Sequence, residues 1–127
     1  MKAIIVDDDS FIRQVLKMML DELSINVVKE SGTLADARSA IKDYPVDVVF
    51  LDIMLPDGDG MDLIEDVKAA QPDCKILMIS GSATKDKVQD SISRGANGFI
   101  VKPFNANIVV KNIAGSLNVE LPDGFNG

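Results

Sequence analysis

The 127-residue sequence contains no histidine and a single cysteine. Without histidine, hydrolysis by an imidazole base, zinc sites with histidine ligands and proton shuttling through histidine are excluded. Cys74 cannot form an internal disulfide, so a reducing cytoplasm is the compartment that fits. Because neither histidine nor a second cysteine accompanies Cys74, we interpret it as a buried structural thiol.

The sequence also lacks a long apolar run and a cluster of positive charge. No apolar stretch approaches the roughly 18–20 residues of a membrane span, and the amino terminus has no signal-peptide pattern. The net charge is −7 and the lysines are scattered, so we expect no membrane insertion and no direct binding of nucleic acid. The balance of 46% hydrophobic and 26% charged residues indicates one ordinary globular domain.

Short apolar runs alternate five times with segments of helical periodicity, which is typical of a βαβ architecture. The strands are predicted near residues 2–6, 26–30, 47–52, 75–80 and 98–101. The helices are predicted near residues 10–23, 34–43, 60–70, 85–94 and 105–117. Each helix follows a residue suited to an N-cap: Ser10, Thr33, Asp59, Thr84 and Asn105. Right-handed crossovers would then give a parallel sheet covered on both faces.

The character of the strands predicts their order. Runs one, three and four are continuously apolar, as strands buried on both faces must be. Run two contains polar residues in its second half, and run five is short and ends before Pro103. Both runs are therefore predicted to be edge strands of the sheet. The expected fold is therefore α/β, a flavodoxin-like (βα)5 doubly wound sandwich with the strand order 2-1-3-4-5.

Five polar residues stand where these runs end: Asp7, Asp8, Asp52, Ser80 and Lys102. The carboxyl ends of parallel strands share one edge of the sheet, where open α/β folds bind ligands. Three carboxylates at that edge repel one another, and a hard divalent cation removes the conflict. Asp52 is placed to attack phosphorus, while a hydroxyl and an ammonium can bind phosphoryl oxygens. The pattern predicts a site for a divalent cation and a phosphoryl group.

Four segments carry a resemblance to a known family: residues 5–8 (IVDD), 51–60 (LDIMLPDGDG), 78–81 (MISG) and 101–104 (VKPF). They resemble the receiver domain of two-component response regulators, in particular single receivers of the chemotaxis-regulator type. The resemblance spans residues 1–118, which we interpret as one receiver domain. Residues 119–127 are interpreted as a C-terminal tail or a truncated linker.

The resemblance implies a phosphorylation-activated signalling switch. Asp52 would accept a phosphoryl group from a sensor histidine kinase or a histidine phosphotransfer protein. Asp8, Asp52 and the backbone carbonyl of Met54 would bind Mg²⁺ or Mn²⁺, and Asp7 would hold a water on the metal. Such a protein catalyses its own phosphorylation and dephosphorylation and is not an enzyme in the usual sense.

The same resemblance assigns the residues that read out the phosphoryl group. Ser80 and Lys102 would hold its oxygens, and a cis peptide bond before Pro103 would direct the lysine. Ser80 and Phe99 occupy the switch positions of the family. Phe99 has no hydroxyl to hydrogen-bond when it turns inward, so a half-buried core residue is the equally open interpretation.

Two further positions tune dephosphorylation in this family, and here they are Met54 and Ser82. Met54 cannot position an attacking water, and the Ser82 side chain is short. We therefore hypothesise a relatively long-lived phosphoaspartate.

The signalling surface implied by the resemblance comprises the fourth helix, the fifth strand and the fifth helix. Its partner would be a downstream protein target or a missing C-terminal output domain, and a homodimer linked to phosphorylation is a further option. The sequence identifies neither the kinase nor the target.

Other functions fit the residues less well. A pseudo-receiver that binds partners without phosphorylation would have lost a metal carboxylate, Asp52 or Lys102, and none is lost. A haloacid-dehalogenase-like phosphatase needs Thr or Val at the position that Phe11 occupies. A calcium loop at residues 57–60 fails because Met61 and Asp62 stand where an oxygen ligand and Gly are needed. A nucleotide-binding module lacks its glycine motif after the first strand.

Overall fold

The computed structural model describes residues 1–117, and its elements follow the predicted alternation. The long strands are β1 (Lys2–Val6), β2 (Asn26–Ser31), β3 (Val48–Leu51), β6 (Lys75–Ser80) and β7 (Gly98–Val101). The helices are α1 (Ser10–Glu22), α2 (Leu34–Asp43), α3 (Leu63–Ala70), α4 (Lys85–Arg94) and α5 (Ala106–Leu117). The tail or linker expected at residues 119–127, and the predicted domain end at residue 118, lie outside the described residues.

The long strands form one five-stranded parallel sheet in the order β2-β1-β3-β6-β7. This confirms the predicted order 2-1-3-4-5, since only the two short strands of an intervening hairpin change the numbering. Val6 pairs with Leu51 on one side and with Ser31 on the other. The carboxyl ends of β1 and β3 therefore lie side by side, at the point where the strand order reverses.

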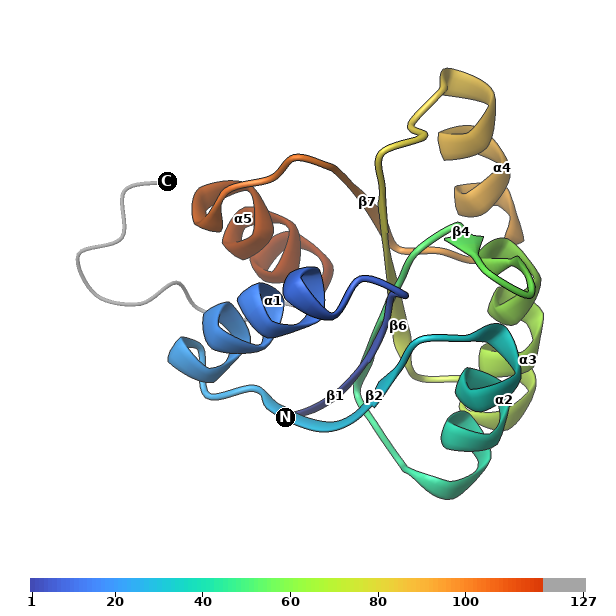
Figure 1. The fold of residues 1–127 in the computed structure, drawn as a ribbon, viewed down its shortest axis with the longest axis horizontal. Helices are drawn as coiled ribbons and strands as arrows, with labels where there is room; N and C mark the ends of the chain where they lie inside the picture. The colour runs from blue at the N-terminus through green and yellow to red at the C-terminus, as the bar shows by residue number, and fades with distance from the viewer. Residues whose placement is uncertain (118–127) are drawn as a thin grey trace.

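Helices cover both faces of the sheet, as Figure 1 shows, with α1 and α5 on one side and α2, α3 and α4 on the other. Alternate residues of β1 separate accordingly. Ala3 and Ile5 belong to the core beneath α1 and α5, whereas Ile4 and Val6 belong to the core beneath α2 and α3. No helix within residues 1–117 is long and apolar enough to span a membrane.

Cys74 lies in the core, as predicted, and burial raises the pKa of its thiol to about 11. A thiol with such a pKa remains protonated and unreactive at neutral pH. The interpretation of Cys74 as a structural residue is confirmed.

Three of the predicted N-caps are confirmed. The side-chain oxygens of Thr33, Thr84 and Asn105 accept a hydrogen bond from the amide three residues on, at 3.1, 3.2 and 2.9 Å. At the first helix the prediction was wrong, because Asp9 is the cap and Ser10 is the first helical residue. The Asp9 carboxylate accepts from the amides two and three residues on, at 2.9 and 3.4 Å, so Ser10 has no amide left to cap.

The third helix begins later than predicted. A two-stranded antiparallel hairpin, β4 (Met54–Leu55) and β5 (Gly58–Asp59), follows β3 and leads into a 3₁₀ helix (Gly60–Asp62). Asp59 caps this short helix and not α3, with its carboxylate 2.9 Å from the amide of Met61. The Gly60 amide donates to the Ile53 carbonyl at 2.6 Å, which draws the chain back toward the end of β3.

Candidate functional site

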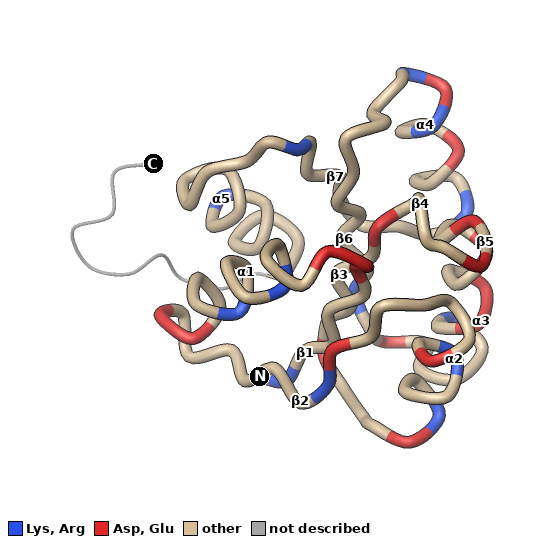
Figure 2. Tube along the Cα trace, viewed as in Figure 1, with Lys and Arg blue, Asp and Glu red and all other residues tan. Residues whose placement is uncertain are grey.

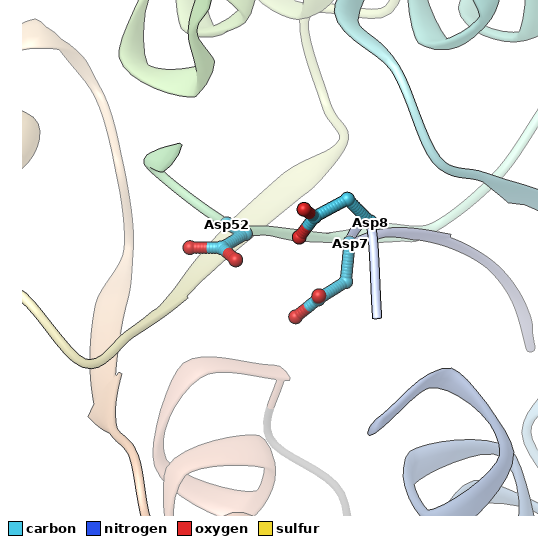
Figure 3. Close-up of side chains that lie close together, drawn as sticks. All are labelled: Asp7, Asp8 and Asp52. Atoms are coloured by element: carbon cyan, nitrogen blue, oxygen red, sulfur yellow. The ribbon is translucent and has the colours of Figure 1, made fainter. Parts of the chain in front are cut away.

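Acidic residues gather at the sheet edge where β1 and β3 end, as the red segments of the chain in Figure 2 show. Asp7 and Asp8 follow β1, and Asp52 follows β3 and donates its amide to the Val6 carbonyl at 2.9 Å. One carboxylate oxygen from each of these three residues lies within 4.8 Å of the others, and Figure 3 shows the side chains converging. Asp7 and Asp52 are only 2% and 5% exposed, whereas Asp8 is open to solvent.

Lys102 reaches this acidic cluster from the end of β7. Its ammonium lies 2.6 Å from Asp7 Oδ2 and 3.0 Å from Asp52 Oδ2. The peptide bond between Lys102 and Pro103 is cis, as expected, and the Lys102 amide donates to the Ser80 carbonyl at 2.9 Å. One ammonium therefore bridges two nearly buried carboxylates that would otherwise repel each other.

Burial and ion pairing shift the pKa values of Asp7 and Lys102 in opposite directions. Burial raises the pKa of Asp7 above its ordinary value, although hydrogen bonds from Lys102 and from the Asp9 amide oppose the rise. Burial alone would lower the pKa of Lys102, but its hydrogen bonds to Asp7 and Asp52 and their charges raise it. Lys102 therefore stays protonated at neutral pH. Three carboxyl groups face one ammonium in this cluster, so the acidic groups outnumber the cation, an imbalance that a divalent cation would offset.

The donor set fits a hard cation. It consists of carboxylate oxygens, with no sulfur or nitrogen ligand among them, and Mg²⁺, Mn²⁺ and Ca²⁺ prefer oxygen. Lys102 contacts the two buried carboxylates, Asp7 and Asp52, while the third, Asp8, is exposed to solvent. The arrangement can hold a divalent cation next to Asp52, which also pairs with the Lys102 ammonium.

Ser80 stands at the end of β6, one strand beyond Asp52 in the sheet. Its side chain is buried, and its hydroxyl oxygen accepts a hydrogen bond from the Ser82 amide at 3.1 Å. Within residues 1–117, no hydrogen bond joins this hydroxyl to Asp52. The structure thus places Asp7, Asp8, Asp52 and Lys102 together and Ser80 at the border of the group.

The two predicted tuning residues contact each other. The Ser82 hydroxyl donates to Met54 Sδ at 3.3 Å, and the Met54 amide donates to Asp52 Oδ1 at 3.3 Å. The Met54 side chain is 64% exposed. This contact connects the loop after β3 with the loop after β6 next to Asp52. Nothing in the residue pattern predicts it, because it depends on the conformation of two separate loops.

Phe99, the second predicted switch residue, lies in the edge strand β7. It is partly buried and packs against the core beneath α2 and α3. This position agrees with a half-buried core residue, and its role as a switch stays a prediction.

Arg13 is a residue of the site that the sequence did not single out. Its Nη1 donates to the Asp7 carbonyl at 2.6 Å, and its Nε donates to Glu30 at 3.2 Å. It therefore links α1 and the edge strand β2 to the turn that carries Asp7 and Asp8. Only its position in the first turns of α1 could have suggested this role, and many exposed arginines share such a position.

Comparisons with known proteins agree with this geometry. The family model described as response regulator receiver domain matches residues 3–114. The chemotaxis protein CheY of Bacillus subtilis (strain 168) is 35% identical over 117 residues, which cover 92% of this chain and 98% of that protein.

Two solved structures have the same fold. The first is from the CheX–CheY–BeF3–Mg²⁺ complex of Borrelia burgdorferi, with a TM-score of 0.87 and 26% identity, covering 94% of this chain and 90% of that chain. The second is the non-phosphorylated HemR receiver domain of Leptospira biflexa, with a TM-score of 0.84 and 26% identity, covering 95% of this chain and 97% of that chain. This chain belongs to the family of response regulator receiver domains and is a single receiver domain of the CheY type.

Proposed function

We propose that this protein is a phosphorylation-activated signalling switch whose phosphoacceptor is Asp52. The carrying observation is the Lys102 ammonium at 3.0 Å from Asp52, within a cluster of three carboxylates suited to a divalent cation. The phosphoryl donor would be a sensor histidine kinase or a histidine phosphotransfer protein. Family membership and the Mg²⁺ in the similar Borrelia complex support this proposal.

The metal proposed here is Mg²⁺, with Mn²⁺ as a substitute. Asp8, Asp52 and the Met54 carbonyl would hold it, and Asp7 would bind one of its waters. The bound cation would neutralise charge on the oxygens of the incoming phosphoryl group.

The transfer itself is a nucleophilic displacement at phosphorus. An oxygen of Asp52 forms the new P–O bond while the P–N bond of the phosphohistidine donor breaks, and the donor imidazole leaves. Lys102 already lies 3.0 Å from the attacking carboxylate, so a small movement lets its ammonium pair with a phosphoryl oxygen. The Ser80 hydroxyl accepts from the Ser82 amide and would donate its own O–H to a second phosphoryl oxygen.

Readout would occur through α4, β7 and α5. Each contributes one exposed apolar side chain, namely Ile92, Val101 and Ile108, between 40% and 47% exposed. A protein partner that covers these elements would bury these apolar side chains. The partner would be a separate target, an output domain or a second copy of this chain, and movement of Ser80 and Phe99 would change this face.

The lifetime of the phosphoaspartate would depend on Met54 and Ser82. The thioether of Met54 accepts only weakly and cannot orient an attacking water, and its contact with Ser82 occupies the hydroxyl that could do so. We therefore propose slow autodephosphorylation.

A pseudo-receiver that never accepts a phosphoryl group is the second candidate. It is disfavoured because Asp7, Asp8, Asp52 and Lys102 are all present and in contact or close to one another. We take the protein to be cytoplasmic. There, a pseudo-receiver would bind its partner whether or not a phosphodonor is present.

Incubation with acetyl phosphate and Mg²⁺ separates these candidates. The switch predicts an adduct that is stable in acid and labile in alkali, and that is absent from Asp52→Asn. The pseudo-receiver predicts no adduct and no effect of that substitution.

A further inference from the structure

The turn of the β4–β5 hairpin is attached to helix α2 by the side chain of Asp57. The Leu34 amide donates to Asp57 Oδ1 at 2.7 Å, and the Ala35 amide donates to Asp57 Oδ2 at 3.0 Å. Both carboxylate oxygens are used, across a separation of more than 20 residues along the chain. The turn, close to the site in sequence, is thus fixed to an element that contributes no site residue.

Charge strengthens this attachment. The first amides of a helix lack partners within the helix and lie at the positive end of its dipole, so a carboxylate there is favourable. The hydrogen bonds from the Leu34 and Ala35 amides hold the pKa of Asp57 below its ordinary value. Asp57 is therefore ionised at any pH at which the protein would function.

The hairpin is held at both ends. Near its turn, a Cβ added to Gly58 would lie 2.9 Å from Leu34 Cδ2, so the hairpin packs directly against the start of α2. At its base, the Gly60 amide donates to the Ile53 carbonyl at 2.6 Å. Met54 lies between these two points, in β4, and donates its amide to Asp52.

We infer that Asp57 is a positioning residue for the metal site, which fixes the hairpin and so holds Met54, whose amide contacts Asp52, where its carbonyl can reach the metal. This inference rests on the proposed function, in which that carbonyl is a metal ligand. If the Asp57 side chain is removed, the turn of the hairpin loses both hydrogen bonds to α2 and keeps only its apolar packing and its attachment at the base. The Met54 carbonyl then samples more positions, and Mg²⁺ binding has to order it at a cost in affinity.

Thr33 offers a matched control. Its hydroxyl accepts from the Asp36 amide at 3.1 Å and so caps the same first turn of α2. Within the described residues it has no hydrogen bond to the hairpin. Thr33→Ala therefore weakens α2 in the same place as Asp57→Ala but leaves the hairpin attached.

The test is calorimetric titration of the full 127-residue chain with Mg²⁺, together with thermal unfolding without metal. Asp57→Ala is expected to weaken Mg²⁺ binding about tenfold, the lower end of what a lost supporting residue costs at metal sites. Thr33→Ala is expected to lower Tm to a similar extent and to keep the wild-type Mg²⁺ affinity. Asp57→Asn, which retains one acceptor oxygen, replaces the alanine variant if that variant does not fold, with a smaller loss in the same direction.

Two outcomes would overturn the inference: wild-type Mg²⁺ affinity in the Asp57 variants, or an equal loss of affinity in Thr33→Ala. Failure of the wild-type chain to bind Mg²⁺ at all would instead overturn the proposed function. The two failures are therefore distinguishable.

Discussion

Gly60 shows how closely the residues around the phosphoacceptor are packed. A Cβ built at this position would lie 1.8 Å from the Asp52 carbonyl oxygen and 2.9 Å from its carbon. These are backbone atoms of the proposed phosphoacceptor, so no side-chain movement can relieve the clash. Glycine is required here for space, independently of its backbone conformation.

Gly60→Ala is expected to destabilise the fold by about 3 kcal/mol, the upper end of what overpacking costs, because the end of β3 must move. Urea unfolding measures this loss. Gly115→Ala in α5 is the matched control, since its Cβ would meet nothing within 4 Å and alanine is favoured in helices. Equal stability of the two variants would show that the close approach at Gly60 has no consequence.

Substitutions at Met54 test the proposed long lifetime of the phosphoaspartate. Met54→Asn supplies an amide that can orient a water, so autodephosphorylation should accelerate by roughly an order of magnitude. This acceleration is smaller than general acid–base catalysis typically contributes. The rate is measured by the loss of the adduct after the phosphodonor is removed. Met54→Leu, of similar volume and without sulfur, should stay near the wild-type rate. A Met54→Asn variant that is no faster than wild type would contradict the proposal.

At the scale of elements, the β4–β5 hairpin is the part of the structure that local sequence patterns could not predict. Its strands have two residues each, too few for any periodicity to be recognised. Tertiary contacts hold it, among them the hydrogen bonds that the first amides of α2 donate to Asp57 and that the Gly60 amide donates to Ile53. The later start of α3 follows from the same contacts.

This attachment predicts a pH dependence of stability. The folded-state pKa of Asp57 lies below its ordinary value of 3.8, so its carboxylate stabilises the fold above that pH. The contribution is lost as the pH falls through the folded-state value. Asp57→Asn should therefore unfold at a lower Tm than wild type at pH 7, and the difference should shrink below about pH 3.8. A difference in Tm that is constant down to pH 3 would argue against an ionised Asp57 at the helix terminus.

On the scale of the whole molecule, the sheet was predictable because burial dictates strand composition. Strands covered on both faces must be apolar throughout, which placed β1, β3 and β6 in the centre and the more polar β2 at an edge. The meeting of Asp7, Asp8, Asp52 and Lys102 follows from that order, since all four stand at carboxyl ends of parallel strands.

Other features depend on choices that the sequence leaves open. Asp9 and Ser10 are both good caps, and only the backbone conformation decides between them. The contacts of Arg13 with Asp7 and of Ser82 with Met54 depend on the conformations of loops, which no local sequence pattern specifies.

The acidic cluster at the sheet edge is proposed to serve the metal-dependent phosphorylation of Asp52. Intact-mass spectrometry of the chain with acetyl phosphate, in Mg²⁺ and in EDTA, tests it most directly. We expect one phosphoryl group per chain in Mg²⁺, located on Asp52 by peptide mapping, and none in EDTA. Modification to the same extent in both conditions, or modification of another residue, would contradict it.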